Sequence, residues 1–171
     1  QSEKVQYGVV PIENSTEGGI SRTLDLLLMK DLKICGEITL PVHHCLISKS
    51  KDLKKITSIY AHGQSLAQCH DWIANNLPNA EKITVLSNAE GAKIASKEKH
   101  SAAIASARAA SIFKLNILQN HIEDEPNNTT RFLILSDQEI SPSGNDKTSI
   151  VVATKNKPCL LYTSDAADEE D

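Results

Sequence analysis

Strand-like and helix-like stretches alternate along the chain. Residues 5–10 are rich in valine, which predicts a strand, and the polar, glycine-containing residues 11–19 predict a turn. Between residues 20 and 28, the apolar positions recur at the spacing of one helix face. The first part of the chain therefore predicts a strand, a turn and a helix.

The middle of the chain continues this alternation with short polar loops between the elements. Ser87 and Glu90 have the spacing of a capping box, which predicts the start of a helix. Strands that alternate with helices over short loops indicate an α/β fold with a parallel or mixed sheet. The expected strands are residues 36–48, 56–61, 83–86, 102–105, 117–122 and 131–135, and the expected helices are residues 66–77, 87–97 and 107–113.

The last part of the chain has a different character. Residues 141–146 contain Ser, Pro, Gly, Asn and Asp, the composition of a linker. Residues 149–154 then predict a further strand, which we interpret as the start of another domain.

The composition is that of a folded globular protein. The chain has 171 residues, of which 40% are hydrophobic and 23% charged, and its formal net charge is −4. This charge argues against a nucleic-acid partner. The longest strongly apolar run, residues 24–29, contains Asp25 and is far too short to span a bilayer, so we expect no membrane partner.

The four cysteines, Cys35, Cys45, Cys69 and Cys159, are scattered and form no C-x-x-C pair. Such cysteines are typical of free thiols in a reducing compartment, so we expect a cytoplasmic protein without disulfides. The chain starts without Met and almost at once enters a predicted strand, from which we expect an amino-terminal truncation.

Three polar turns, residues 13–16, 62–65 and 127–131, adjoin predicted strands. In open α/β sheets ligands lie beyond the strand ends, so these turns are expected to converge on one crevice. They offer a carboxylate, a guanidinium, amides and hydroxyls, but no nucleophile–base pair. This set suits binding and orienting a polar anion, although a capped helix alone would explain any single turn.

Two other groupings argue against metal or nucleophilic chemistry. His43, His44 and Cys45 are adjacent, but neighbours on a strand point to opposite faces and do not easily hold one ion. Cys69 and His70 lie about 100° apart on a helix, with Cys69 on the apolar face. With no phosphate loop or dinucleotide fingerprint in the sequence, we expect no metal and no cofactor.

Taken together, the three turns resemble a known family. The segment YGVVPIENSTEG at residues 7–18 resembles the GVVPIENSxEG segment of prephenate dehydratases. IYAHGQSLAQC at residues 59–69 is similar to that family's YSHxQxLAQC, with Ala61 where the family often has Ser. NTTRF at residues 128–132 is similar to its N-x-T-R-F motif. The sequences of these three motifs are most similar to those of the bifunctional chorismate mutase–prephenate dehydratases of proteobacteria.

The resemblance implies an α/β, two-lobed fold like that of type II periplasmic binding proteins, with the site in the cleft between the lobes. It covers a dehydratase domain that lacks its amino-terminal part, followed by a regulatory region. The implied domains are the dehydratase domain 1–138 (lobe one 1–36 and 130–138, lobe two 37–125), a linker 139–146, the truncated start of an ACT domain 147–162 and a non-native tail 163–171.

The implied activity is that of a lyase that converts prephenate to phenylpyruvate, carbon dioxide and water in phenylalanine biosynthesis. Phenylalanine would inhibit only the full-length enzyme, which would be a homo-oligomer. We expect this chain alone to have no appreciable activity. The alternative is a non-catalytic module of the same fold that binds a small carboxylic acid, and the Thr-Arg-Phe segment favours the enzyme.

The candidate catalytic residues are Thr130, Arg131 and Phe132. Thr130 would donate a hydrogen bond to the departing hydroxyl, and Phe132 would pack beneath the site. Arg131 would hold a substrate carboxylate bidentately, or instead pair with Glu13 to fix the lobes. The expected substrate-binding residues are Glu13, Asn14, Ser15, His62, Gln64, Gln68 and Asn128.

Overall fold

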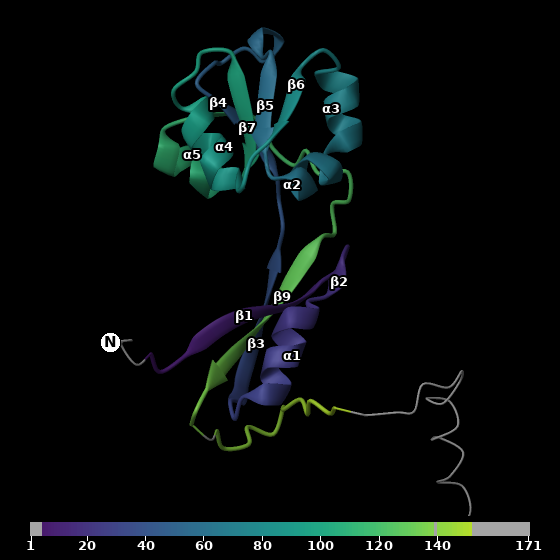
Figure 1. Ribbon diagram of the computed structural model, residues 1–171, viewed down its shortest axis with the longest axis vertical. Helices are drawn as coiled ribbons and strands as arrows, with labels where there is room; N and C mark the ends of the chain where they lie inside the picture. Colours follow the sequence, from purple (N-terminus) through teal and green to yellow (C-terminus); the bar gives the residue numbers. More distant parts are fainter. Residues whose placement is uncertain (1–4, 139, 152–171) are drawn as a thin grey trace, which may run out of the picture. The chain divides into compact units, whose positions relative to one another are not determined.

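The computed structural model describes residues 5–138 and 140–151 and divides the chain into two units, Gln1–Glu139 and Ile140–Asp171. All strands and helices of the described residues lie in the first unit (Figure 1). The strands are β1 (Gly8–Asn14), β2 (Gly18–Gly19), β3 (Lys33–Pro41), β4 (Cys45–Ser48), β5 (Ser58–Ala61), β6 (Glu81–Thr84), β7 (Ser101–Ala105), β8 (Asn116–Gln119) and β9 (Thr129–Ser136). The helices are α1 (Ser21–Met29), the 3₁₀ turn η1 (Leu53–Lys55), α2 (Gly63–Gln68), α3 (His70–Asn76), α4 (Asn88–Ala95) and α5 (Ala107–Phe113).

The first sheet is antiparallel, with the strand order β2-β1-β9-β3. Strand β9, the last in the chain order, lies between β1 and β3 and pairs with both along most of its length. The register places Asn14 of β1 opposite Thr130 of β9, and Glu13 opposite Arg131. This register brings the first and third polar turns of the sequence together.

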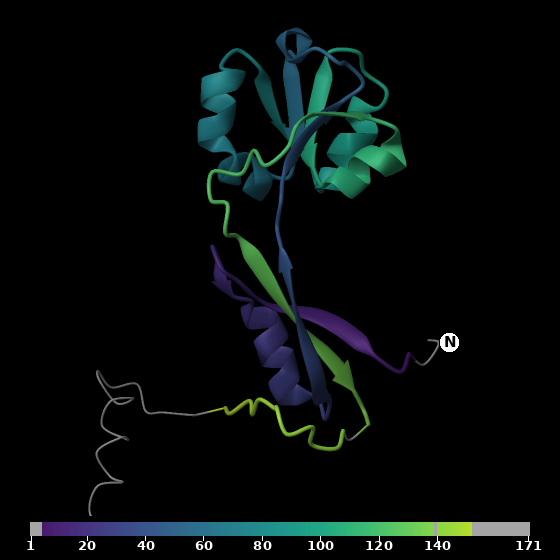
Figure 2. The ribbon, with the colours of Figure 1, turned by 180° about the vertical axis from the view of Figure 1, so that it is seen from behind.

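The second sheet is mixed, with the order β6-β5-β7-β4-β8. Strand β5 runs parallel to β6 and β7, whereas β4 is antiparallel to β7 and β8. Helix α3 covers one face, and α4 and α5 cover the other (Figure 1, Figure 2). The predicted α/β class with a mixed sheet is therefore confirmed, and the structure adds a further, antiparallel sheet.

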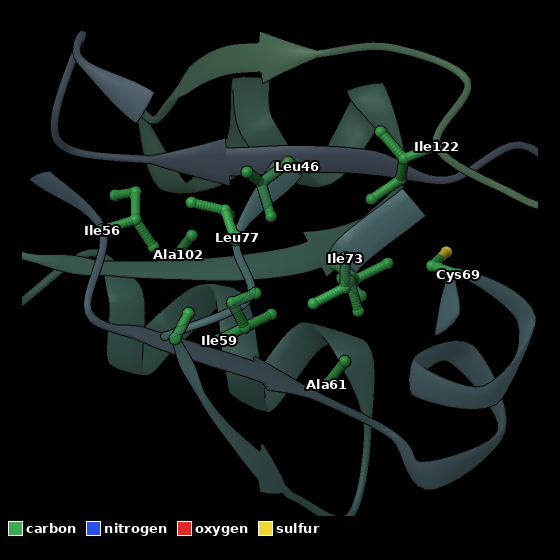
Figure 3. Close-up of a cluster of buried hydrophobic side chains, with 11 residues drawn as sticks. Leu46, Ile56, Ile59, Ala61, Cys69, Ile73, Leu77, Ala102 and Ile122 are labelled. Atoms are coloured by element: carbon green, nitrogen blue, oxygen red, sulfur yellow. The ribbon is translucent and has the colours of Figure 1, made fainter. Parts of the chain in front are cut away.

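Alternation along the strands builds a separate core on each face of the second sheet. In β4, Leu46 belongs to the core under α3, and Ile47 belongs to the core under α4 and α5. The α3 side, shown in Figure 3, also holds Ile59 of β5 and Ile73 of α3, both fully buried. Because both faces are covered, β7 is buried at every position.

Glycine at position 91 lets helix α4 lie directly on strand β5. A Cβ added there would lie 2.7 Å from the backbone carbonyl oxygen of Tyr60. Since that oxygen belongs to a paired strand of the sheet, it cannot rotate away as a side chain could. The close approach of α4 therefore depends on the absence of a side chain at this position.

Local signals predicted the starts of α4 and α5 well. The Ser87 hydroxyl accepts the Glu90 N–H at the start of α4, and Glu90 in turn accepts the Leu86 N–H, so the predicted cap is confirmed. Helix α5 spans the predicted residues 107–113. Residues 66–77, however, form two helices, α2 and α3, because the chain leaves helical geometry at Cys69.

The predicted turn at residues 11–19 is wrong in its first half. Strand β1 continues to Asn14, because Glu13 and Asn14 pair with β9, and a bulge between Pro11 and Glu13 accommodates the proline. The single extended segment expected at 36–48 is also wrong, since it forms β3 in the first sheet and β4 in the second. Strand β3 runs to Pro41, beyond the expected lobe boundary at residue 36.

The predicted apolar face of α1 is present. Against the part of the chain that the structure describes, however, no residue of this helix is buried. Leu24, Leu28 and Met29 are exposed, as is Val9 on β1. No helix in the described part of the chain has the length and apolar character needed to cross a membrane.

The second unit is described only for residues 140–151, which contain no strand. The rest of the strand predicted at 149–154, most of the expected ACT segment 147–162 and the whole tail 163–171 lie outside the described residues.

Three cysteines, Cys35, Cys45 and Cys69, are free thiols, as predicted, and Cys159 lies outside the described residues. Cys69 is fully buried in the core under α3 (Figure 3). Burial, with a smaller contribution from the Asp124 and Glu123 carboxylates, raises the pKa of Cys69 to about 12. Burial also raises the pKa of Cys45.

We predict that Gly91→Ala destabilises the protein. The overlap with the Tyr60 carbonyl costs about 3 kcal/mol as overpacking, while the better helix propensity of Ala returns about 1 kcal/mol. The free energy of unfolding, measured in urea, should fall by the difference, roughly 2 kcal/mol. Gly63→Ala is the control, since its Cβ would meet Thr84 at an ordinary 3.6 Å. Equal stability of the two variants would show that α4 and β5 are not in close contact.

We also predict that the cysteines differ in reactivity with iodoacetamide at pH 8. The thiolate is the nucleophile, and a pKa of about 12 leaves roughly 0.01% of Cys69 ionised. Cys35, which is only half-buried, should be alkylated first. Peptide mass spectrometry should find Cys45 and Cys69 modified only after urea is added. Modification of native Cys69 as fast as Cys35 would contradict the burial described above.

Candidate active site

The Asn14 side chain organises the junction of β1 and β9. Its two amide N–H groups donate to the Asn128 Oδ1 and the Thr130 Oγ1, both at 2.9 Å. Its own Oδ1 accepts the backbone N–H groups of Thr16 and Glu17 at 3.0 and 3.2 Å. Both polar atoms of the amide are thus engaged, each in two hydrogen bonds, which fixes Asn14 in one orientation.

The half-buried Thr130 hydroxyl therefore has a defined role in hydrogen bonding. Its oxygen accepts the Asn14 amide, and its proton has no acceptor among the described residues. A hydroxyl can accept and donate at the same time, so the proton of Thr130 is free to serve a bound molecule.

Ser15 and Asn128 tie the turn after β1 to the start of β9. The Ser15 hydroxyl accepts the Thr129 N–H at 2.9 Å, and the Ser15 N–H donates to the Thr129 carbonyl at 2.9 Å. The buried Asn128 accepts from both Asn14 and Ser15, the latter at 3.4 Å. These hydrogen bonds thus hold the turn that carries Asn14 beside the start of β9, where Thr130 lies.

Arg131 lies between two carboxylates of the same sheet. Its Nε donates to the Glu37 Oε2 at 2.7 Å, and its Nη2 lies 2.6 Å from the same oxygen. The Glu13 Oε2 is farther away, 3.8 Å from Nη1. Since Glu13, Glu37 and Arg131 lie on β1, β3 and β9, the Glu13 pair joins neighbouring strands, not two lobes as the alternative expectation had it.

Strand alternation separates Arg131 from Thr130. Adjacent residues of a strand point to opposite faces, and the partners agree, since Thr130 contacts Asn14 whereas Arg131 contacts Glu13 and Glu37. Phe132 shares the face of Thr130 and is half-buried. The structure thus brings Thr130 and Asn14 together and does not place Arg131 beside them.

The second predicted turn forms the start of α2. His62 is its N-cap residue, and the imidazole Nδ1 accepts the Gln64 N–H at 3.3 Å. The Gln64 amide donates to the Glu17 carboxylate, and the Gln68 Oε1 lies 2.9 Å from the His44 Nε2. His62 and Gln64 are thus engaged in local contacts, and Gln68 holds a buried histidine.

Three of the predicted residues, Gln64, Gln68 and Asn128, line the same hollow, which has a volume of about 390 Å³. His62 instead lines a different hollow of about 530 Å³. The residues around the first hollow are Thr16, Glu17, Gln64, Ala67, Gln68, Glu123, Asp124, Glu125 and Asn128.

The first hollow is strongly acidic. It carries four carboxylates, and none of the described residues that line it is Lys or Arg. A dianion would meet repulsion there, so binding must rely on neutral amide and hydroxyl donors or on cations from elsewhere. Sequence reasoning missed Glu17, Glu123 and Asp124 in this wall, and it missed Glu37 as the partner of Arg131.

Comparison with known proteins agrees with this architecture. The family model for prephenate dehydratase matches residues 1–140. The chain is 50% identical to the bifunctional chorismate mutase/prephenate dehydratase of Pseudomonas aeruginosa, over 92% of this chain and 44% of that protein. It is 41% identical to the prephenate dehydratase of Methanocaldococcus jannaschii, over 91% of this chain and 58% of that protein. The chain thus spans about half the length of the curated relatives it matches.

A solved structure supports the same assignment. The prephenate dehydratase of Arthrobacter aurescens, solved in complex with L-Phe, superposes with a TM-score of 0.71 at 33% identity. The superposition covers 84% of this chain and 48% of that one. A family model that spans most of the chain, supported by this likeness in fold, shows that the chain belongs to the prephenate dehydratase family.

Proposed function

We propose that this chain carries part of the active site of a prephenate dehydratase, a lyase that converts prephenate to phenylpyruvate in phenylalanine biosynthesis. The family match and the names of the relatives support this substrate. The observation that carries the proposal is the Asn14–Thr130 hydrogen bond. It leaves the hydroxyl proton of Thr130 available at the start of β9, beside the end of β1.

The reaction itself explains why one well-placed donor is useful. The bond between the ring and its carboxylate breaks, its electrons enter the ring, and the ring hydroxyl leaves as water with one proton. Because the products include an aromatic ring and carbon dioxide, the substrate supplies most of the driving force. The protein must orient the substrate and stabilise the charge that develops on the departing oxygen.

Thr130 is the proposed donor to that oxygen. The Asn14 amide donates to the Thr130 Oγ1 and draws electron density from that hydroxyl. The hydrogen bond that the Thr130 hydroxyl donates in turn is thereby strengthened. Since Asn14 is fixed by the Thr16 and Glu17 N–H groups, the donor is positioned before substrate binds. The hydrogen bond would grow as the carbon–oxygen bond breaks.

Arg131 is proposed to position the sheet, although the sequence suggested a carboxylate clamp. Its guanidinium is engaged by Glu37 and lies on the face opposite to Thr130. It would hold β3 beside β9, and thereby keep Thr130 at the correct register with Asn14. Phe132, on the face of Thr130, is proposed to pack against that site.

The acidic hollow supports the expectation that this chain alone has no appreciable turnover. Prephenate carries two carboxylates, whereas the hollow presents four of its own. The Asn128, Gln64 and Gln68 amides are neutral, and the Gln64 amide already donates to Glu17, so these side chains do not compensate the four negative charges. We therefore propose that productive substrate binding requires the longer protein.

Regulation and location are proposed on the same basis. The Arthrobacter relative was solved with L-Phe, and we propose that phenylalanine inhibits the full-length protein as an allosteric ligand. Homo-oligomerisation of the full-length protein and a cytoplasmic location remain proposals of the same kind. The free thiols Cys35, Cys45 and Cys69 fit a reducing compartment.

We predict that Thr130→Val in the full-length protein lowers kcat and kcat/KM together by about 10²–10⁴-fold, because Val keeps the β-branched shape but removes the donor. KM should change little, since the bond strengthens only as the reaction proceeds. Thr130→Ser should retain part of the rate. Steady-state formation of phenylpyruvate is the measurement.

Thr129→Val is the matched control, because it removes a hydroxyl from the adjacent residue, which points to the other face of β9. Its kcat should stay near that of the unmodified protein. If Thr130→Val instead lowers the melting temperature and leaves kcat intact, Thr130 is a structural residue and the proposed mechanism is wrong.

A further inference from the structure

Three side chains of types that can bind a metal meet away from Thr130, where two connections between the sheets run side by side. His43 lies between β3 and β4, and His121 and Glu123 lie between β8 and β9. The Ile122 N–H donates to the His44 carbonyl at 3.0 Å, which fixes the two connections together. The cluster is thus built by tertiary structure and not by a local sequence motif.

The three ligand atoms form a compact triangle. The His43 Nδ1 lies 2.8 Å from the Glu123 Oε1, and the His121 Nδ1 lies 3.3 Å from the same oxygen. The two Nδ1 atoms are themselves 3.3 Å apart. The two rings are nearly perpendicular, with an interplanar angle of 78° and centroids 4.5 Å apart.

These separations match those within a metal coordination shell. With metal–ligand bonds of about 2.0–2.2 Å, neighbouring ligands lie about 3.0–3.4 Å apart in octahedral and tetrahedral sites. The triangle has a circumscribed radius of about 1.8 Å, so a point about 2.1 Å from all three atoms exists just above its plane. One ion can therefore contact all three ligands with little movement.

Hydrogen bonding cannot satisfy all three contacts of this triangle at once without a cation. Each neutral imidazole has one N–H and one lone pair. A single proton serves one of the three contacts and leaves two lone pairs facing each other. Two protons directed at the Glu123 Oε1 satisfy both contacts to that oxygen, but they leave the His43–His121 contact between two N–H donors. A cation would bind all three lone pairs at once.

The surroundings fix the position of Glu123. Its side chain is only 2% exposed, and its Oε2 accepts the His44 backbone N–H at 2.8 Å. The His43 and His121 side chains, 41% and 65% exposed, leave an open side for water ligands.

We propose that His43 Nδ1, His121 Nδ1 and Glu123 Oε1 form a binding site for a divalent first-row transition-metal ion such as Zn²⁺, with water completing the shell. Two imidazole nitrogens and one carboxylate oxygen suit this class of ion, whereas Mg²⁺ and Ca²⁺ prefer all-oxygen sites. The sequence pointed away from a metal because it paired His43 with His44. In the structure, His44 turns to Gln68, and His43 meets His121, which lies 78 positions away in the sequence.

Zinc titration of the chelator-treated chain tests the proposal. We expect saturable binding of one Zn²⁺ at this site, measured by calorimetry, and a rise in melting temperature with zinc but not with Mg²⁺. Co²⁺ in place of zinc should give visible absorption bands typical of imidazole ligation. An absence of saturable binding below millimolar zinc would overturn the proposal and leave the cluster as a hydrogen-bonded group.

Two variants assign the binding to these residues. His121 has a left-handed φ of 51°, which glycine adopts freely, so His121→Gly should fold while lacking one ligand. His43→Ala removes the other imidazole. Each should weaken zinc binding about 100-fold or more, since removing a group that only orients a ligand already costs about 10–100-fold. His100→Ala, which removes an exposed imidazole elsewhere, should bind as the unmodified chain does. Unchanged affinity in both His121→Gly and His43→Ala would refute the site.

Discussion

The insertion of β9 between β1 and β3 is the pairing on which the first sheet and the candidate site depend. Without β9, strands β1 and β3 would have no common neighbour among the described strands. The same pairing sets Thr130 opposite Asn14, and it sets Arg131 where two glutamates flank it. One register therefore determines both the free hydroxyl and the ion pairs.

Because side chains alternate along β9, its two faces make different interactions. The Thr130 face carries hydrogen bonds among neutral groups, with Asn14 as their centre. The Arg131 face carries charge, and two carboxylates compensate the guanidinium. Under the proposed function, a guanidinium paired in this way would contribute little to holding a substrate carboxylate, because binding would have to replace a partner already in place. Neutral donors would then be the groups that this chain offers to a ligand.

The sequence predicted the features that depend on neighbouring residues. The α4 cap needs only Ser87 and Glu90, and the range of α5 follows from its own apolar spacing. The continuation of β1 to Asn14 was missed because its partner, Thr130, lies 116 positions away in the sequence. Glu37 as the partner of Arg131, and His121 as the neighbour of His43, were missed for the same reason. Neither local propensity nor spacing reports the register of distant strands.

Glu123 links the acidic hollow to the proposed metal site, since the same side chain lines one and contributes a ligand to the other. The hollow holds four carboxylates, and repulsion among them and with an anionic ligand falls only slowly with distance in a partly buried setting. A divalent cation bound as proposed to Glu123 would offset two of those four charges without occupying the hollow. It would also join the two connections between the sheets through His43 and His121. The electrostatic character of the hollow would then depend on the ion bound behind its wall, as well as on the residues that face the ligand.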